Sequence, residues 1–252
     1  MTESAGSQTS GADLDTYFEV VASEGVYPHP ENLRFYTRLL FQDIPLRGAS
    51  LLEIGGGSGY LSFYAAFAGA RRVVCLEPGS AGSENRRIGQ FEALARRFRR
   101  PEVSLRPETL QDFDPGGERF DVLLLNSSIN HLDEEACIRL RDDPEARHRY
   151  HKIFEKLATL TKPGGRLVTT DASRYNILGS LGLRHPLARH IDWHKHQTPW
   201  VWARLLAASG FTQARIDWVP PNTLRTPGRI LFGNVVGAFF ISSQFRLVMT
   251  RA

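Results

Sequence analysis

The sequence predicts an α/β fold in which a mostly parallel sheet of seven strands carries helices on both faces. Short apolar runs alternate with longer segments of helical periodicity from residue 48 onward. Such alternation is typical of a parallel sheet with right-handed crossovers. A glycine-rich stretch, LLEIGGGSGY at 51–60, begins with the first apolar run. A strand, a tight turn and a helix in this order indicate a nucleotide-type cofactor site.

Apolar content and turn residues place the individual elements. Strands are expected at 50–54, 72–76, 103–106, 120–125, 166–170, 211–219 and 237–249, and helices at 14–21, 31–41, 58–70, 84–100, 144–161 and 199–209. The run FDVLLL at 120–125 is almost wholly apolar, as in strands buried on both faces. A turn is expected at 163–165 and a turn-rich connection at 220–229. The apolar tract 230–241 is too short to span a bilayer and favours a buried strand.

Composition shifts suggest how the chain is organised. Residues 1–12 are small and polar and are expected to form a disordered tail. Residues 13–252 are expected to form a single domain. Its parts are an N-terminal cap (13–47), a cofactor-binding core (48–171), an insertion (172–198) and the C-terminal part of the sheet (199–252). The N-terminal cap and the stretch 172–200 are predicted to act as lids.

The overall composition limits the classes of partner. A chain of 252 residues with net charge +4 and 42% hydrophobic residues is ordinary for a globular protein. This charge is too small to predict a nucleic-acid partner. No apolar leader or membrane-spanning segment is evident, so a cytoplasmic location is expected. Cys75 and Cys137 lie far apart and are predicted to be free thiols.

The glycine stretch itself indicates the kind of cofactor. Gly55, Gly57 and Gly59 alternate, whereas a dinucleotide site needs G-x-G-x-x-G and has Tyr60 here instead of the third glycine. Glu53 precedes the loop, and a carboxylate there would repel a pyrophosphate but attract a cationic ligand. Glu77 follows the second strand, where an acid can bind ribose hydroxyls, as it also does in NAD sites. These residues favour a cofactor with an ammonium and a sulfonium over NAD(P).

Residues 50–171 resemble the class I S-adenosylmethionine (SAM)-dependent methyltransferases of the small-molecule type. The matching pieces are LLEIGGGSGYLSFYAAFAGARRVVCLEP, FDVLLLNSSINHL and LTKPGGRLVTTD. The resemblance implies a Rossmann-like sheet with SAM as cofactor. It further implies cofactor contacts by Glu53, Gly55, Gly57, Gly59, Glu77, Thr109, Leu110, Asn126 and Ser127. Thr109 departs from the family pattern, which often has an acid at this place.

Histidines are the candidate general bases, because methylation of a hydroxyl is helped by removal of its proton. His131 follows the fourth strand in NSSINHLDEE, although a capping or surface role is the alternative. Asp133 and Glu134 after it could orient its ring or cap the next helix, and capping is the favoured interpretation. His194 and His196 alternate within HIDWHKHQ, so an extended segment would place both on one face. Four roles remain open for these histidines: general base, substrate-orienting group, metal ligand beside Asp171 or Asp192, and a purely structural role. The metal role is the least favoured, and no metal is predicted.

The acceptor site is expected in the segments outside the core. Tyr17, Tyr27, Arg174 and Trp193 are candidate substrate-binding residues. The favoured function is methyl transfer to a small-molecule acceptor, at a hydroxyl oxygen of a metabolite or natural-product intermediate. The alternatives are an N- or C-methyltransferase, a methyltransferase acting on protein or RNA, a non-catalytic SAM-binding protein and an NAD(P) oxidoreductase. The protein is expected to be a monomer or a homodimer.

Overall fold

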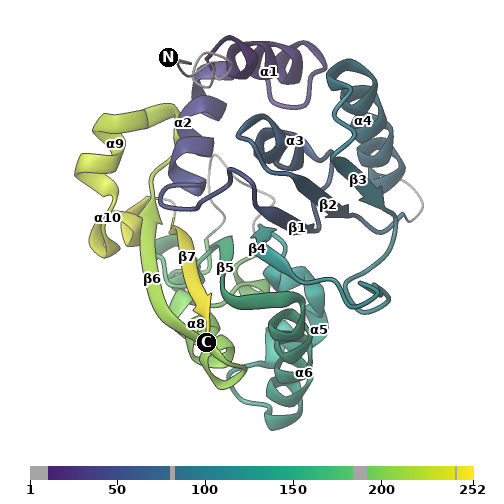
Figure 1. Ribbon diagram of the computed structural model, residues 1–252. Helices are drawn as coiled ribbons and strands as arrows, with labels where there is room; N and C mark the ends of the chain where they lie inside the picture. The colour runs from purple at the N-terminus through teal and green to yellow at the C-terminus, as the bar shows by residue number, and fades with distance from the viewer. Residues whose placement is uncertain (1–10, 80–82, 184–191, 242) are drawn as a thin grey trace, which may run out of the picture. The chain divides into compact units, whose positions relative to one another are not determined.

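The computed structural model describes residues 11–79, 83–183, 192–241 and 243–252. The chain divides into two compact units, Met1–Phe113 and Asp114–Ala252, whose elements are traced in Figure 1. The described residues contain seven strands of a mixed, mostly parallel sheet with helices around it. The predicted fold class is therefore confirmed, whereas the single domain over 13–252 stays a prediction.

The first unit contains three parallel strands in the order β3-β2-β1. Its elements, in chain order, are α1 (Gly11–Ser23), α2 (Pro30–Leu40), β1 (Ser50–Ile54), α3 (Tyr60–Phe67), β2 (Arg72–Leu76), α4 (Ser83–Phe98) and β3 (Val103–Arg106). All three strands have the predicted bounds. Each apolar run is short, and a polar residue, a glycine or a proline follows it. Helix α1 already begins at Gly11, so the expected disordered tail is wrong for Gly11 and Ala12. The rest of that tail, 1–10, lies outside the described residues.

Helix α1 is held against α3 and α4 by an aromatic cluster. The Tyr17 hydroxyl donates a hydrogen bond to the Tyr60 carbonyl oxygen at 2.7 Å, and its ring stacks on Phe98 with centroids 5.6 Å apart. Phe63 of α3 and Phe91 of α4 continue the cluster with centroids 5.1 Å apart. The N-terminal helix therefore belongs to the core of this unit, next to the start of α3.

The second unit contains four strands in the order β4-β5-β7-β6. They are β4 (Phe120–Asn126), β5 (Thr161–Ala172), β6 (Phe211–Val219) and β7 (Gln244–Arg251). Strands β4 and β5 are parallel. Strand β7 runs antiparallel to both of its neighbours and lies between β5 and β6 in Figure 1. A reversed last strand accounts for a sheet that is mixed rather than wholly parallel.

The remaining elements of the second unit are short and long helices around these strands. They are η1 (Ile129–Leu132), α5 (Glu134–Arg139), α6 (Pro144–Leu160), α7 (Ile177–Ser180), η2 (Trp193–Lys195), α8 (Pro199–Ala208), η3 (Asn222–Leu224), α9 (Arg225–Phe232) and α10 (Val235–Phe240). Tyr150 and Phe154 of α6 pack on Trp202 of α8 with ring centroids 5.1 and 6.0 Å away. No helix in the described ranges is long and apolar enough to cross a bilayer. Cys75 and Cys137 are free thiols, as predicted, and both are buried.

Three predictions for the second unit are wrong. The tract 230–241 is not a buried strand but belongs largely to α9 and α10, so β7 begins at Gln244 instead of 237. Asn234 starts α10 by accepting hydrogen bonds from the backbone N–H groups of Val236 and Gly237. Periodicity does not separate a short apolar helix from a strand, which explains this error. Most of the connection predicted at 220–229 is likewise occupied by η3 and the start of α9.

The turn expected at 163–165 is also wrong, because β5 already begins at Thr161. The pairing of β5 with β4 shifts register between Phe120 and Val122. Gly165 has no room for a side chain, since a Cβ atom would lie 2.8 Å from the Lys162 carbonyl oxygen. The proline and glycines therefore produce an irregularity inside the strand instead of ending it.

Replacing Leu124 by alanine is expected to destabilise the protein strongly. Leu124 lies in β4 with 0% of its surface exposed, and a Leu→Ala change in such a core costs about 2–5 kcal/mol. Urea unfolding followed by circular dichroism measures the effect. Ile138→Ala is the matched control, because Ile138 is 44% exposed and its replacement is expected to change stability by less than about 0.5 kcal/mol. Equal midpoints for both variants would contradict the packing described for β4.

Candidate functional site

The glycine loop after β1 is held against the carboxyl end of β2. The backbone N–H groups of Gly55 and Gly56 both donate to the Leu76 carbonyl oxygen, at 2.8 and 3.0 Å. The N–H group of Gly57 donates to Glu77 Oε2 at 2.8 Å. Gly55, Gly57 and Gly59 have φ angles of +71°, +59° and +70°, which side chains other than glycine rarely adopt. The sequence therefore needs glycine here to bring the backbone round.

Close contacts add a second reason for glycine in this loop. A Cβ atom on Gly56 would collide with Cys75 Sγ, and one on Gly59 would collide with the Phe91 ring. Gly59 is the N-cap of α3 and supplies no side-chain hydrogen bond to the helix. The first backbone N–H groups of α3 have no acceptor within the helix, so they can donate hydrogen bonds to a ligand next to the loop.

Glu77 is a buried carboxylate at the end of β2, with a relative exposure of 3%. One of its oxygens accepts the Gly57 hydrogen bond, and the other lies 3.4 Å from Nη1 of Arg87. Arg87 itself comes from α4 and is 56% exposed. Glu77 therefore couples the loop to β2 and has the acceptor capacity that ribose hydroxyls require.

Glu53 is buried in β1, with an exposure of only 1%. Ser62 Oγ donates a hydrogen bond to Glu53 Oε2 at 2.5 Å. Burial raises the pKa of Glu53 from 4.5 to about 8, against the opposing effect of the Ser62 hydrogen bond. The side chain is therefore largely neutral at pH 7 in the ligand-free chain. Desolvation therefore outweighs the hydrogen bond in the ligand-free chain, and the role of Glu53 towards a cationic ligand stays a prediction.

The other predicted cofactor residues lie at the ends of β3 and β4. Thr109 exchanges hydrogen bonds with Asp112, its Oγ1 lying 2.6 Å from Asp112 Oδ2, while Leu110 is buried in the core. Asn126 Oδ1 accepts a hydrogen bond from Thr170 Oγ1 at 2.7 Å. Ser127 has a φ angle of +55°, an uncommon conformation that is frequent at functional sites. The same segment contains two carboxylates, Asp112 and Glu108. The resemblance to the family did not point to either of them.

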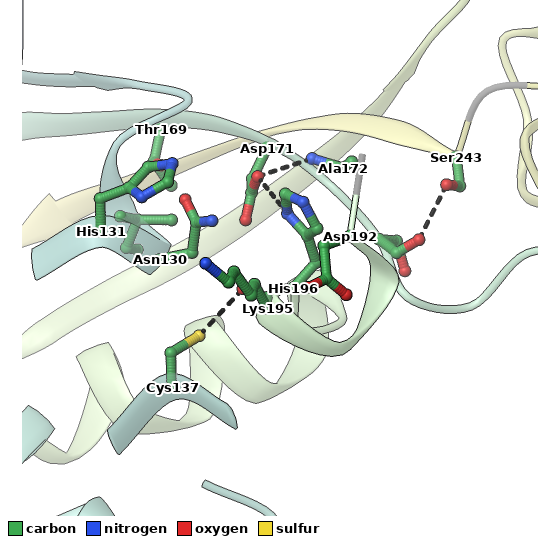
Figure 2. Close-up of polar contacts among 12 residues, drawn as sticks. Asn130, His131, Cys137, Thr169, Asp171, Ala172, Asp192, Lys195, His196 and Ser243 are labelled. Atoms are coloured by element: carbon green, nitrogen blue, oxygen red, sulfur yellow. Dashed lines mark hydrogen bonds and ion pairs between the residues drawn. The ribbon is translucent and has the colours of Figure 1, made fainter. Parts of the chain in front are cut away.

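In the second unit, a histidine contacts a buried carboxylate at the end of β5. His196 Nδ1 lies 2.9 Å from Asp171 Oδ1, and only 14% and 1% of their side chains are exposed. The N–H group of Ala172 donates to the same oxygen at 2.8 Å. Burial raises the pKa of Asp171, and the hydrogen bond with His196 acts in the opposite direction. Figure 2 shows the imidazole of His196 facing this carboxylate.

Two buried acceptor atoms beside this pair lack a partner in the described structure. They are Oδ2 of Asp171 and Oδ1 of Asn130, and Asn130 is only 1% exposed. The hydroxyl of Tyr150 donates to the Asn130 carbonyl oxygen at 3.2 Å and so holds η1 in place. Figure 2 shows the Asn130 amide next to the Asp171 carboxylate. Because buried polar atoms are normally paired, this arrangement is suited to a polar ligand.

His131 has a different environment from His196. Its side chain is 54% exposed, and Nδ1 lies 2.6 Å from Glu134 Oε1. The other Glu134 oxygen pairs with Lys195 Nζ at 2.8 Å, and the hydrogen bonds from Lys195 and His131 lower the pKa of Glu134. Asp133 caps α5 through a hydrogen bond from Ala136, as predicted, whereas the Glu134 side chain contacts His131 and Lys195.

His194 lies in η2 and is exposed. Its backbone N–H group donates to Asp192 Oδ1 at 3.2 Å. The extended conformation that would place His194 and His196 on one face is wrong, because the segment forms a 3-10 turn. Within the described parts of the chain, no three His, Cys, Asp or Glu side chains are grouped as a metal ion would need.

The four candidate substrate residues lie in different surroundings. Tyr17 is fully buried in the aromatic cluster, and the Tyr27 ring lies 6.1 Å from that of Tyr60. Arg174 follows β5, and burial lowers the pKa of its guanidinium. Trp193 donates from Nε1 to the Leu183 carbonyl oxygen at 3.3 Å. Their roles towards a substrate stay predictions.

The raised pKa of Glu53 predicts a pH-dependent stability for the ligand-free protein. Glu53 binds its proton more tightly in the folded state, so its contribution is complete below pH 4.5 and is lost as the pH rises to about 8. The loss is at most about 5 kcal/mol. Urea midpoints should therefore fall from pH 5 to pH 8 by more in the natural protein than in Glu53→Gln, which keeps an acceptor for Ser62. Parallel pH curves for the two proteins would show that Glu53 ionises normally.

Comparisons with known proteins point to one family. A family model described as a methyltransferase domain matches residues 29–215. A ubiquinone biosynthesis O-methyltransferase from Methylobacterium sp. (strain 4-46) is 28% identical over 178 residues, covering 68% of this chain. The chain spans 62% of the length of that relative.

Solved structures show the same fold at low sequence identity. A SAM-dependent methyltransferase from Aquifex aeolicus superposes with a TM-score of 0.59 at 14% identity, over 92% of this chain and 98% of that one. The 1,6-didemethyltoxoflavin-N1-methyltransferase of Burkholderia thailandensis, solved with bound 1,6-didemethyltoxoflavin and S-adenosylhomocysteine, superposes with a TM-score of 0.53 at 18% identity, over 100% of this chain and 93% of that one.

The matched region begins just before α2 and extends into β6, so it includes the glycine loop, Glu77 and the His196–Asp171 pair. The chain therefore belongs to the methyltransferase-domain family, and its cofactor is SAM.

Proposed function

We propose that this enzyme methylates a hydroxyl oxygen of a small-molecule acceptor, with His196 as the general base and Asp171 as the group that orients it. The observation that carries the proposal is the 2.9 Å contact between His196 Nδ1 and the buried Asp171 carboxylate. The similarity to an O-methyltransferase supports the choice of oxygen.

The residues of the first unit fit the cofactor. The glycine loop brings backbone N–H groups close to a ligand without side chains in the way, and Glu77 supplies a buried carboxylate for the ribose hydroxyls. Glu53, Gly55, Gly57 and Gly59 would hold the methionine part, and Thr109 and Leu110 would contact the adenine. When bound, SAM supplies an electrophilic methyl group on a sulfonium.

The His196–Asp171 pair has the chemistry of a base with an orienting partner. An ionised carboxylate only accepts hydrogen bonds, so Asp171 keeps the proton of His196 on Nδ1 and leaves the Nε2 lone pair available. Nε2 then takes the proton of the acceptor hydroxyl as the oxygen attacks. The buried negative charge of Asp171 stabilises the imidazolium that results.

The unpartnered oxygens beside this pair support a hydroxylated acceptor. Asn130 Oδ1 and Asp171 Oδ2 are both hydrogen-bond acceptors and both are buried. A second hydroxyl of the substrate can donate to one of them and so recover the free energy lost by burying an unpaired polar atom. Oxygen methylation also needs proton removal, because a neutral hydroxyl is a weak nucleophile.

His131 is a weaker candidate for the same role. Its Nδ1 is also bound to a carboxylate, but that carboxylate is 43% exposed and is shared with Lys195. Salt and water weaken such exposed pairs, so Glu134 would stabilise an imidazolium less than the buried Asp171 does. We therefore assign the base to His196 and use His131 as a comparison.

An acceptor screen tests the proposed reaction. Matched sets of phenols, aliphatic alcohols and amines of similar size are incubated with the enzyme and SAM. Formation of S-adenosylhomocysteine and the mass-spectrometric position of the methyl group are then measured. We expect methylation at oxygen of at least one hydroxylated compound. Turnover of amines alone would contradict the proposal.

Replacing His196 by alanine is expected to lower kcat by about 10²–10⁴-fold with the hydroxylated acceptor found in that screen. SAM affinity, measured by calorimetry, should change little. Asp171→Asn should lower kcat at least about tenfold, because it removes the charge that orients and stabilises the imidazole. His194→Ala is the matched control and should stay close to the natural rate, since His194 is exposed. A large loss in His131→Ala together with full activity in His196→Ala would assign the base to His131 instead.

A further inference from the structure

One part of the second unit exposes most of the large apolar side chains on the described surface. Of all the strongly exposed large hydrophobic residues in the described ranges, only Ile138 lies outside 175–240. Ile230, Leu231 and Val236 are 75%, 64% and 62% exposed, and Leu181 and Phe240 are 64% and 57% exposed. Such concentration is unusual, because scattered single apolar residues are the rule on protein surfaces.

These side chains belong to segments that contact one another. Helix α10 follows α9 after Gly233 and Asn234. The two helices approach closely, since a Cβ atom on Gly237 would lie 2.6 Å from Phe232 Cα. Phe239 of α10 packs on Tyr175, near the start of α7, with ring centroids 4.9 Å apart. The exposed apolar residues of α9 and α10, together with Tyr175 and Leu181 on either side of α7, therefore form one apolar surface.

The charge of these segments is entirely positive. Residues 218–252 contain no aspartate or glutamate, and of their four arginines Arg225 and Arg229 lie on α9, whereas Arg246 is buried and pairs with Asp217. Arg225 and Arg229 are exposed on α9, the helix that carries Ile230 and Leu231. An apolar surface with arginines and no carboxylates complements an anionic lipid interface, where phosphates pair with arginine and acyl chains receive the apolar groups.

A second copy of the chain fits this surface less well. A twofold contact would place the same patch on both sides. The arginines of α9 would then lie near those of the other copy, and like charges repel. Helices α9 and α10, with eight and six residues, are too short to span a bilayer.

We propose that the apolar surface formed by α9, α10 and the residues beside α7 docks this enzyme on a membrane that contains anionic phospholipids. Ile230, Leu231, Val236 and Phe240 insert at the boundary between headgroups and acyl chains. Arg225 and Arg229 contact the lipid phosphates. The docking is peripheral and reversible, since only short helices take part.

Sedimentation of the full chain with vesicles tests the proposal. We expect the protein to sediment with vesicles of phosphatidylglycerol and phosphatidylcholine. Binding should be at least about tenfold weaker to phosphatidylcholine alone and should weaken with added salt. The double variant Ile230→Ser/Leu231→Ser should bind the mixed vesicles at least about tenfold more weakly. Ile138→Ser is the matched control and should bind like the natural protein, because Ile138 lies outside the surface.

Arg225→Gln/Arg229→Gln separates the electrostatic part, and it should weaken binding to the mixed vesicles and reduce its salt dependence. Circular dichroism and urea midpoints confirm that each variant is folded. Failure of the natural protein to sediment with the mixed vesicles would overturn the proposal, as would unchanged binding of the Ile230→Ser/Leu231→Ser variant. A homodimer that this variant converts to a monomer, without any vesicle binding, would identify the surface as an interface between copies instead.

Discussion

The attachment of the glycine loop to the end of β2 is the constraint on which the first unit depends. Three backbone N–H groups of the loop are bound there, two by the Leu76 carbonyl oxygen and one by the Glu77 carboxylate. Cys75 and Phe91 leave no room for a side chain at Gly56 or Gly59. The start of α3 follows directly, and Tyr17 of α1 is bonded to it through the Tyr60 carbonyl. A change in this loop would therefore affect the strand, the helix and the N-terminal aromatic cluster together.

The two buried acids on either side of this attachment differ in their partners. Glu77 binds a backbone N–H group and lies near an arginine. Glu53 has the hydroxyl and the backbone N–H group of Ser62 as hydrogen-bond donors, and burial nevertheless raises its pKa to about 8. Burial disfavours a charge unless hydrogen bonds or an opposite charge compensate for it. A ligand that brings a positive charge to this site would supply the compensation that Glu53 lacks.

The second unit combines a polar site with an unusual surface. Its polar site is built around Asp171, where His196, the Ala172 N–H group and an unpartnered oxygen meet in a buried position. Its surface carries the exposed apolar residues of α9 and α10, with Tyr175 and Leu181 beside α7. The polar site is suited to a hydroxylated acceptor. The apolar surface is suited to contact with a lipid interface. The proposed general base and the proposed lipid-docking surface involve different residues, so a separate experiment tests each of them.

The sequence alone determined the strands of the first unit, the glycine loop and the type of cofactor. Those features follow from short-range rules, namely apolar runs closed by turn residues and φ angles that only glycine adopts readily. The tertiary structure decided the features that need distant segments or burial. It paired His196 with Asp171 across 25 residues, made Glu53 neutral and turned 225–240 into two exposed helices. Which polar groups meet, and which are removed from water, depends on how the chain packs, and no local pattern of residues encodes that.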